Sequence, residues 1–308
     1  MRNKITIVGA GNVGASCAVW LAERDLGDIV LVDIPVTKDM PKGKALDMSQ
    51  VGPISGYNTR LTGTTGYDET ADSDVCVITA GVPRKPGMSR EDLVGINQGI
   101  VQEVVTKFLP GSPNAIVVVV SNPLDTMSYV AFKTAGLPKQ RVIGQAGVLD
   151  GARMRTFMAL ELEVAVENCH ATVLGGHGDE MVPITRYCTV FGVPIGELLP
   201  ADRVQAIVER TRKGGGELVN LLGVSAWYAP GAAAGLMVDA ILKDKHLVVP
   251  CSAYLEGEYG LSGMYFGVPC KLGRSGLEEI VQLKLTDDEL GLLKKSEALI
   301  RETMKALK

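Results

Sequence analysis

Short runs of consecutive apolar residues alternate with amphipathic stretches along the first half of the chain. Strands that are apolar without a polar alternation are buried on both faces, as in a parallel sheet covered by helices. The pattern therefore predicts a doubly wound α/β unit. Its expected strands lie at 4–8, 29–34, 74–80, 115–120 and 141–146, and its expected helices at 12–24, 42–50, 90–109 and 123–136.

The second half of the chain has a different pattern. Apolar segments broken by Gly and Pro favour antiparallel strands, and helical stretches near 200–222 and 228–243 stand between them. Thr286 and Glu289 form a capping box, which predicts a last helix ending near Leu307. The expected strands lie at 171–184, 247–255, 265–273 and 279–285. We therefore expect a parallel-sheet domain at 1–145 and a closely packed, mixed α+β domain with antiparallel strands at 146–308.

The composition is that of an ordinary soluble globular protein. The 308 residues are 46% hydrophobic and 21% charged, with a formal net charge of −4. The chain has no excess of basic residues, which argues against a nucleic-acid-binding surface. No apolar run approaches the roughly 18 residues of a membrane span. Because the first expected strand begins at residue 4, little room remains for a signal peptide, so we expect a cytoplasmic protein.

The cysteines lie far apart and form no C-x-x-C pair. This spacing offers no zinc site, and a chain of this size does not need disulfides to fold. We therefore expect reduced, mostly buried thiols and no metal site. The residues concerned are Cys17, Cys76, Cys169, Cys188, Cys251 and Cys270.

A G-x-G-x-x-G sequence, GAGNVG, directly follows the first expected strand and opens a helix. In this context Gly9 makes a tight turn, Gly11 lets the backbone approach a pyrophosphate, and Gly14 permits close contact of helix and strand. The helix N-terminus offers N–H groups and a positive dipole to the phosphates. The alternative is a tight turn without a ligand. The expected cofactor-binding residues of this Rossmann-type domain are Gly9, Ala10, Gly11, Asn12, Val13 and Gly14.

Asp33 stands at the end of the second expected strand, 19 residues after Gly14. A carboxylate at this place accepts hydrogen bonds from the adenosine ribose hydroxyls, and it repels a 2′-phosphate. The sequence therefore favours NAD over NADP as the cofactor. A merely polar strand end is the alternative explanation.

The three histidines are candidates for the proton donor that hydride transfer between a nicotinamide and a carbonyl requires. His246 stands at the start of a strand, and His170 alternates with apolar neighbours. His177 follows a strand and has glycine on both sides, which would let a ligand come close. Taken alone, His177 would be interpreted as a turn residue.

Asp150 and Arg153 change this interpretation. Because they are three residues apart, they share one face of a helix. A carboxylate beside an imidazole orients the ring and stabilises its protonated form, and an arginine fork matches a substrate carboxylate. An ordinary exposed ion pair is the alternative. The dinucleotide motif favours a reactive site that combines both residues with His177.

The stretch GVPRKPGMSRED at 81–92 places three cations in a segment that glycine and proline keep out of helices and central strands. A solvated surface loop is one explanation. The other is a mobile loop that delivers Arg84 and Arg90 to an anion. Lys85 has no assigned role in either case.

With these motifs on the page, the chain resembles the malate/lactate dehydrogenase superfamily, and within it the lactate-dehydrogenase-like malate dehydrogenases. The matching stretches occur in the family's order and span both halves, so the resemblance covers essentially the whole chain. They are GAGNVG (9–14), PRKPGMSR (83–90), SNPLD (121–125), VLDGAR (148–153) and GGHGDEMVP (175–183).

The resemblance implies reversible hydride transfer between (S)-malate and oxaloacetate with NAD⁺/NADH, a step of the tricarboxylic acid cycle. It implies that His177 is the acid–base catalyst and Asp150 its partner. The substrate-binding residues would be Arg84, Arg90, Asn122 and Arg153. Beyond the glycine turn and Asp33, the cofactor-binding residues would be Asn97, Val120, Ser121 and Asn122.

In the family the segment at 83–90 closes over the substrate, and lactate dehydrogenases carry glutamine where this chain has Arg84. An arginine there matches the second carboxylate of a dianion, which could not be enclosed without a cation except at a large cost in free energy. The resemblance also implies a homotetramer, with a dimer as the alternative. Two other functions stay open: a lactate or other 2-hydroxyacid dehydrogenase, and a non-catalytic dinucleotide-binding redox sensor.

Overall fold

The computed structural model describes residues 2–83 and 89–308, and for Arg90 its main chain alone. The first half of the chain forms a parallel sheet with the strand order β3-β2-β1-β4-β5-β6. Neighbouring strands β1 and β4 mark the place where the order reverses. The strands are β1 (Lys4–Val8), β2 (Asp28–Val32), β3 (Leu61–Thr64), β4 (Val75–Ile78), β5 (Ile116–Val119) and β6 (Val142–Gly144).

Alternate residues of these strands face two separate cores. In β4, Val75 and Val77 pack on one side of the sheet, whereas Cys76 and Ile78 pack on the other. Helices therefore cover both faces, which confirms the doubly wound fold class predicted from the apolar runs. The first face is covered by α1 (Asn12–Glu23), α2 (Met40–Ser55) and α8 (Tyr228–Leu242), and the second by α3 (Arg90–Phe108) and α4 (Leu124–Ala135).

Antiparallel strands from the second half continue the same sheet beyond β6. Strand β12 (Leu247–Glu256) pairs with β6 at Ser252 and Gly144 and then with β13 (Ser262–Gly273) along its whole length. Strands β14 (Gly276–Ile280) and β8 (Val173–Gly175) pair with β13, and β9 (Met181–Pro183) pairs with β8. The two halves of the chain are thus joined by strand pairing.

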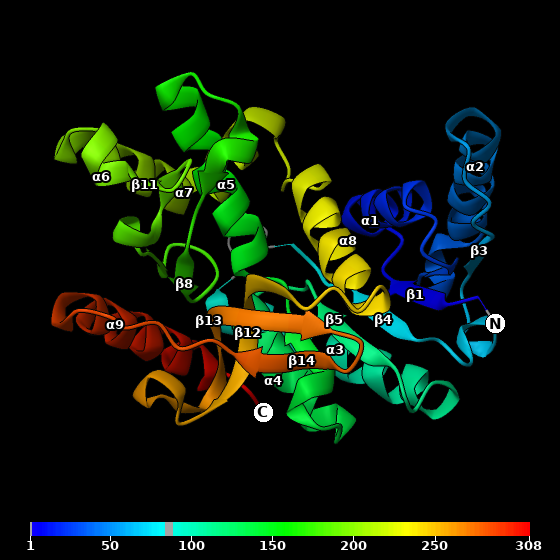
Figure 1. Cartoon of the computed structure of the whole chain (residues 1–308). Helices are drawn as coiled ribbons and strands as arrows, with labels where there is room; N and C mark the ends of the chain where they lie inside the picture. The colour runs from blue at the N-terminus through cyan, green and yellow to red at the C-terminus, as the bar shows by residue number, and fades with distance from the viewer. Residues whose placement is uncertain (1, 84–88) are drawn as a thin grey trace.

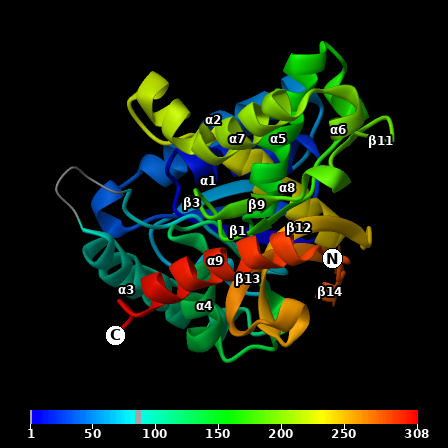
Figure 2. The ribbon, with the colours of Figure 1, turned by 90° about the vertical axis from the view of Figure 1, so that its left-hand side faces the viewer.

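A third core lies away from the parallel sheet, between α5 (Gly147–Leu162) and α7 (Ala201–Leu222), with Met154, Met158 and Ile207 at its centre. Figure 1 shows α5, α6 and α7 gathered on one side of α8, with α1 and α2 on the other side. In Figure 2 the last helix, α9 (Asp287–Met304), crosses the face of the molecule near α3 and α4.

The remaining elements are short. A small antiparallel sheet has the order β11-β10-β7. Its strands are β7 (Cys169–His170), β10 (Thr189–Val190) and β11 (Val193–Pro194), and α6 (Ile195–Leu198) follows. The 3₁₀ helices are η1 (Pro35–Thr37), η2 (Asp68–Thr70), η3 (Leu109–Gly111), η4 (Lys139–Arg141), η5 (Val166–Asn168), η6 (Thr185–Tyr187) and η7 (Glu258–Gly260).

The capping box before α9 is confirmed. Thr286 Oγ1 accepts the N–H of Glu289 at 3.3 Å, and the Glu289 carboxylate accepts the N–H of Thr286 at 2.8 Å. The strand expected at 279–285 is wrong beyond Ile280. There the hydroxyl of Tyr259 donates to the carbonyl of Val281 and accepts the N–H of Leu283, so a side chain satisfies main-chain groups that a partner strand would otherwise bind.

The expected thiols are confirmed as free and buried for all six cysteines. Burial raises the pKa of the Cys17 thiol to about 12, with a smaller opposing effect of Arg24, and burial raises that of Cys188 to about 11. Within the described part of the chain, no helix combines the length and the apolar character needed to cross a membrane.

Candidate active site

The glycine turn between β1 and α1 has the geometry that a dinucleotide requires. Gly9 has φ +105°, and its N–H donates to the carbonyl of Val32 at 2.8 Å. A Cβ on Gly14 would lie 1.9 Å from the carbonyl oxygen of Gly9, whereas a Cβ on Gly11 would meet nothing within 4 Å. The turn is therefore tight at both ends and open at Gly11, where a phosphate could approach the start of α1.

Asp33 connects this turn to the end of β2. Its Oδ2 accepts the N–H of Ala10 at 2.8 Å, and its Oδ1 accepts the N–H of Ile34 at 2.8 Å. Each carboxylate oxygen has a second lone pair. The side chain can thus hold the turn and still accept hydrogen bonds from ribose hydroxyls, and its negative charge stands where a 2′-phosphate would come.

The turn lies at the point where the strand order reverses. Helix α1 covers one face of the sheet and α3 covers the other. In such sheets the ligand crevice is expected outside the carboxyl ends of the two strands at this point, here β1 and β4. The Thr79 hydroxyl, just after β4, donates to the carbonyl of Gly9 at 2.8 Å. This hydrogen bond holds the glycine turn against the carboxyl end of β4.

Asn97 joins the loops that follow β4 and β5. Its side chain is buried, its Oδ1 accepts the N–H of Val82 at 2.8 Å, and its Nδ2 donates to the carbonyl of Asn122 at 2.7 Å. Nearby, the Ser121 hydroxyl donates to the carbonyl of Ala80, and the N–H of Val120 to that of Ile78. The structure thus places Asn97 and residues 120–122 together along the crevice.

The predicted acid–base residue His177, its partner Asp150 and the predicted substrate-binding Arg153 meet at the start of α5 and the turn after β8. Nδ1 of His177 lies 2.8 Å from Oδ2 of Asp150, and Nη1 of Arg153 lies 3.2 Å from Oδ1 of the same carboxylate. The Asp150 side chain is 2% exposed, against 13% for His177 and 14% for Arg153. The carboxylate is therefore enclosed, while the two cationic groups reach the surface of the site.

Electrostatics at this cluster favour the protonated imidazole. Burial lowers the pKa of His177, and the positive charge of Arg153 lowers it further. The charge and hydrogen bond of Asp150 raise the pKa, and the net result lies above the usual value. Since Nδ1 faces Asp150, Nε2 is the ring nitrogen left for a substrate oxygen. Nε of Arg153 is buried and has no hydrogen-bond partner within the described residues, whereas the Arg153 side chain as a whole is 14% exposed.

Asp125, in the first turn of α4, is a further member of this cluster, and the sequence analysis gave it no role. Its Oδ2 accepts the main-chain N–H of His177 at 2.9 Å, and its Oδ1 accepts the hydroxyl of Ser252 at 2.6 Å. Burial raises the pKa of this carboxyl to about 6, although both hydrogen bonds lower it. Its place after β5, at the sheet edge where Asn122 lies, was the available signal.

The side chains of the two loop arginines, Arg84 and Arg90, lie outside what the structure describes. Arg84 lies outside the described residues, and for Arg90 the structure gives the first residue of α3. Ser89 caps that helix: its Oγ accepts the N–H of Asp92 at 3.0 Å, and the Asp92 carboxylate accepts the N–H of Ser89. The interpretation of both arginines as substrate ligands stays a prediction.

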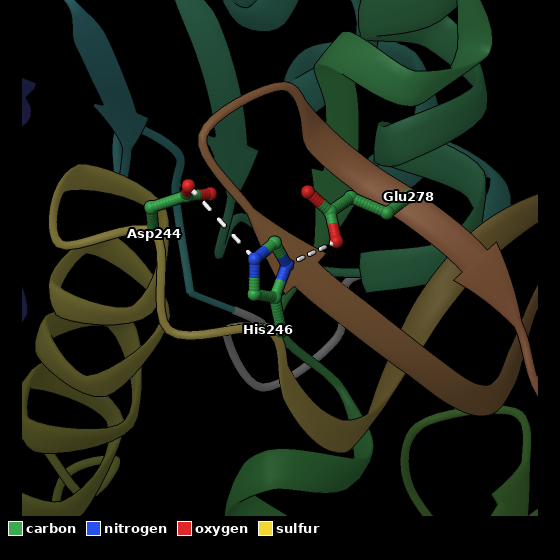
Figure 3. Close-up of side chains that lie close together, drawn as sticks. All are labelled: Asp244, His246 and Glu278. Carbon is green, nitrogen blue, oxygen red and sulfur yellow. Dashed lines mark hydrogen bonds and ion pairs between the residues drawn. The ribbon is translucent and has the colours of Figure 1, made fainter.

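The remaining histidines lie elsewhere. His170 is exposed in β7, and His246 lies between two carboxylates just before β12 (Figure 3), with Nδ1 2.7 Å from Glu278 and Nε2 3.9 Å from Asp244. Of the described residues, these three are the group that could hold a metal ion. However, each ring nitrogen faces a different carboxylate, and one ion cannot bind both nitrogens, so the geometry is that of an ion-pair cluster.

The sheet order, the open glycine turn and the enclosed imidazole–carboxylate pair together indicate a class: a dinucleotide-binding α/β oxidoreductase. Comparison with known proteins narrows the class. The family model of the lactate/malate dehydrogenase NAD-binding domain matches residues 3–144, and that of the lactate/malate dehydrogenase α/β C-terminal domain matches residues 147–308. The chain belongs to the lactate/malate dehydrogenase family, and NAD is its cofactor.

Individual relatives are similar over their full length. A malate dehydrogenase of Roseiflexus sp. (strain RS-1) is 55% identical over 309 residues, covering 100% of this chain and 99% of that protein. The structure of malate dehydrogenase from Salinibacter ruber has a TM-score of 0.95 at 50% identity, covering 99% of this chain and 97% of that one. A lactate dehydrogenase from Cryptosporidium parvum, complexed with lactic acid and the dinucleotide, has a TM-score of 0.95 at 39% identity, covering 100% and 98%.

Proposed function

We propose that the chain is an NAD-dependent malate dehydrogenase, which interconverts (S)-malate and oxaloacetate in the tricarboxylic acid cycle. The observation that carries the proposal is the His177–Asp150 pair at 2.8 Å, with Arg153 on the second carboxylate oxygen. A protein that merely bound a dinucleotide would not need this arrangement. The full-length relative from Roseiflexus, named malate dehydrogenase, supports malate over lactate.

In the direction of reduction, His177 acts as the acid. Its imidazolium gives the Nε2 proton to the C2 oxygen of oxaloacetate, and Asp150 stabilises the imidazolium before transfer and orients the neutral ring afterwards. Bound NADH would supply the hydride for C2, which balances the reduction of the carbonyl to an alcohol with the formation of NAD⁺. In the reverse direction neutral His177 accepts the hydroxyl proton of malate.

Arginines bind the carboxylates of the substrate in this proposal. Arg153 holds the C1 carboxylate, and its partly exposed side chain beside the His177–Asp150 pair supports this role. Arg90 polarises the reacting carbonyl, and Asn122 donates to the same substrate oxygen. Arg84 pairs with the second carboxylate, which distinguishes oxaloacetate from pyruvate. The roles of Arg84 and Arg90 rest on their motif.

The turn at 9–14 and the start of α1 would hold the pyrophosphate of the cofactor, because helix N–H groups there have no partner within the helix. Asp33 would bind the adenosine ribose. Asn97 and residues 120–122, which lie together after β4 and β5, would hold the nicotinamide end.

The proposal extends to organisation and place. Residues 1–145 form the NAD-binding domain and 146–308 the catalytic domain, a division supported by the two family models, which adjoin between 144 and 147. A homotetramer, or else a dimer, is supported by apolar side chains on the outer helices: Ile54 of α2 is 85% exposed and Leu221 of α7 74%. The protein acts in the cytoplasm on small molecules.

The test is a panel of 2-oxo acids assayed with NADH and with NADPH. We expect oxaloacetate with NADH to give the highest kcat/KM. A preference for pyruvate would identify a lactate dehydrogenase instead. NADH binding without turnover of any 2-oxo acid would identify the remaining alternative, a dinucleotide-binding redox sensor.

A further inference from the structure

Asp125 holds the backbone of His177, whereas Asp150 holds its ring. The Asp125 residue is 5% exposed, and both of its carboxylate oxygens are hydrogen-bonded: Oδ2 to the N–H of His177 at 2.9 Å and Oδ1 to the Ser252 hydroxyl at 2.6 Å. Two carboxylates from different helices therefore act on one histidine, one through the main chain and one through the side chain.

Packing fixes the position of Asp125. Its partner Ser252 is fully buried on β12 and pairs with Gly144 of β6. A Cβ on Gly144 would lie 2.8 Å from the Cβ of Ser252 and 2.5 Å from Oγ of Ser128, on the same helix as Asp125. The absence of a side chain at Gly144 thus lets α4, β6 and β12 approach closely, and the carboxylate of Asp125 is held where the three elements meet.

The charged groups around Asp125 and His177 come from few elements. The charges that act on Asp125 are those of His177 and Asp150, and those that act on His177 are Asp150, Arg153 and Asp125. Strand β12 contributes the uncharged Ser252, and α9 contributes the uncharged Ser296, whose Oγ accepts the N–H of Gly176 at 2.9 Å. The turn itself also carries Asp179 and Glu180, and Arg212 of α7 donates to the carbonyl of Met181.

We propose that Asp125 is a positioning residue for His177, which fixes its main chain and, as a carboxylate, adds a second negative charge that favours the imidazolium. This rests on the acid–base role of His177 proposed above. The first turn of α4 supports the charged form, because the positive end of a helix dipole stabilises an anion.

The protonation states of both groups bear on this charge. Burial raises the pKa of Asp125 to about 6, and the pKa of His177 lies above its usual value. Near neutral pH Asp125 is therefore mostly charged, so that the main chain and the ring of His177 each lie beside a carboxylate.

The experiment compares pH profiles of kcat/KM for oxaloacetate in the wild type and in Asp125→Asn. Asparagine can still accept the N–H of His177 and donate to the Ser252 hydroxyl, so the change is mainly one of charge. Reduction needs the imidazolium, so activity falls as the pH rises through the pKa of His177. We expect this fall to move to lower pH by about half a unit, less than the roughly 1–3 units of a carboxylate in direct contact with the ring.

Ser296→Ala is the matched control. It removes the buried hydroxyl of α9 that accepts the N–H of Gly176, the residue before His177, and it does not change the charge. It is expected to lower kcat without moving the profile. If Asp125→Asn behaves in the same way, with a lower plateau and an unmoved fall, Asp125 has only a structural role and the proposal is overturned.

A second variant covers the case in which Asp125→Asn does not fold. Ser252→Ala keeps the Asp125 carboxylate but removes the hydroxyl donor that lowers the pKa of Asp125. A smaller fraction of Asp125 is then charged near neutral pH. A smaller shift of the fall in the same direction supports the proposal, and an unmoved fall contradicts it. A wild type that turned over no 2-oxo acid would instead refute the proposed function, before any variant was compared.

Discussion

Nδ1 of His177 and Oδ2 of Asp150 lie 2.8 Å apart, and the aspartate side chain is 2% exposed. The pair fixes which ring nitrogen carries the exchangeable proton, because Nδ1–H is committed to the carboxylate in both protonation states. Only Nε2 is left to exchange a proton with a substrate. The buried contact between Asp150 and Nδ1 thus decides which ring nitrogen faces the substrate.

The pH dependence of the two reaction directions follows from this pair. The pKa of His177 is raised, so kcat/KM for oxaloacetate should stay high below that pKa and fall above it, while kcat/KM for malate should rise through the same pKa. Asp150→Asn removes the main cause and should move both profiles to lower pH by about 1–3 units. Steady-state rates at a series of pH values test this. Profiles that stay in place in Asp150→Asn would show that another group titrates.

Replacement of the acid itself should remove turnover. For His177→Asn we expect kcat to fall by about 10²–10⁴-fold, the usual contribution of general acid–base catalysis, while NADH binds as before. His246→Asn is the control: this histidine is 54% exposed, it pairs with Glu278, and its positive φ of 51° is one that asparagine tolerates. Turnover and NADH fluorescence titrations measure both effects. Near-normal activity of His177→Asn would place the proton donor elsewhere.

Cofactor choice should depend on the charge of Asp33. The wild type should prefer NADH strongly, because a carboxylate repels the 2′-phosphate of NADPH. Asp33→Asn keeps a side-chain oxygen for the N–H of Ala10, now accepted at 2.8 Å, and removes the charge. We expect the ratio of kcat/KM for NADH over NADPH to fall by about tenfold or more, which corresponds to roughly 1.4 kcal/mol. An unchanged ratio would remove this role from Asp33.

Substrate choice should depend on Arg84. Arg84→Gln keeps a polar side chain but leaves the second carboxylate of oxaloacetate without a cation, at a cost of roughly 2–5 kcal/mol. This corresponds to about 30- to 4000-fold lower kcat/KM. Pyruvate has a methyl group at that position, so its kcat/KM should rise or stay level. Parallel assays with oxaloacetate and pyruvate test this. An equal fall of both kcat/KM values would show that the substitution damages the active site as a whole and that Arg84 does not distinguish the two substrates.

Helix α7 carries three consecutive glycines that should respond differently to alanine. A Cβ on Gly216 meets nothing within 4 Å, whereas a Cβ on Gly214 lies 3.3 Å from Cδ of Arg153. Gly216→Ala should therefore raise the free energy of unfolding by about 0.4–1 kcal/mol, because it restricts the unfolded chain. Urea denaturation at equal protein concentration measures the change.

Gly214→Ala is the matched variant in the same helix. Its methyl group presses on Arg153, so kcat/KM for oxaloacetate should fall by about three- to tenfold as the guanidinium is displaced. Gly216→Ala should leave kcat/KM unchanged. Equal kinetics of the two variants would mean that Gly214 does not set the position of Arg153.

The elements of the first half could be predicted from local sequence because their causes are local. A buried parallel strand such as Val75–Ile78 is apolar at every position, and the box of Thr286 and Glu289 lies within a single turn. The Asp150–His177 contact was inferred because a carboxylate orients an imidazole and stabilises its protonated form, and the family resemblance implied that Asp150 is the partner of His177.

Features that depend on distant parts of the chain could not be predicted in this way. Asp125 is buried against β12, where the hydroxyl of Ser252, 127 residues further along, donates to it. Its local sequence places it at the sheet edge near Asn122 but gives no sign that it is buried or that it contacts His177. The early end of β14 likewise depends on the hydroxyl of Tyr259, a side chain more than twenty residues away that replaces the hydrogen bonds of a partner strand.

The strand ladder between β6 and β12 runs across the boundary between the two halves of the chain. The Tyr265 hydroxyl adds a further bond across it, to the carbonyl of Val142 at 3.0 Å. Moving the two halves apart would break these bonds, so Asp125 of the first half and His177 of the second keep their relative position before a substrate binds. For these two residues a substrate does not have to supply the free energy of ordering the protein, and more of its binding free energy remains for affinity and selectivity.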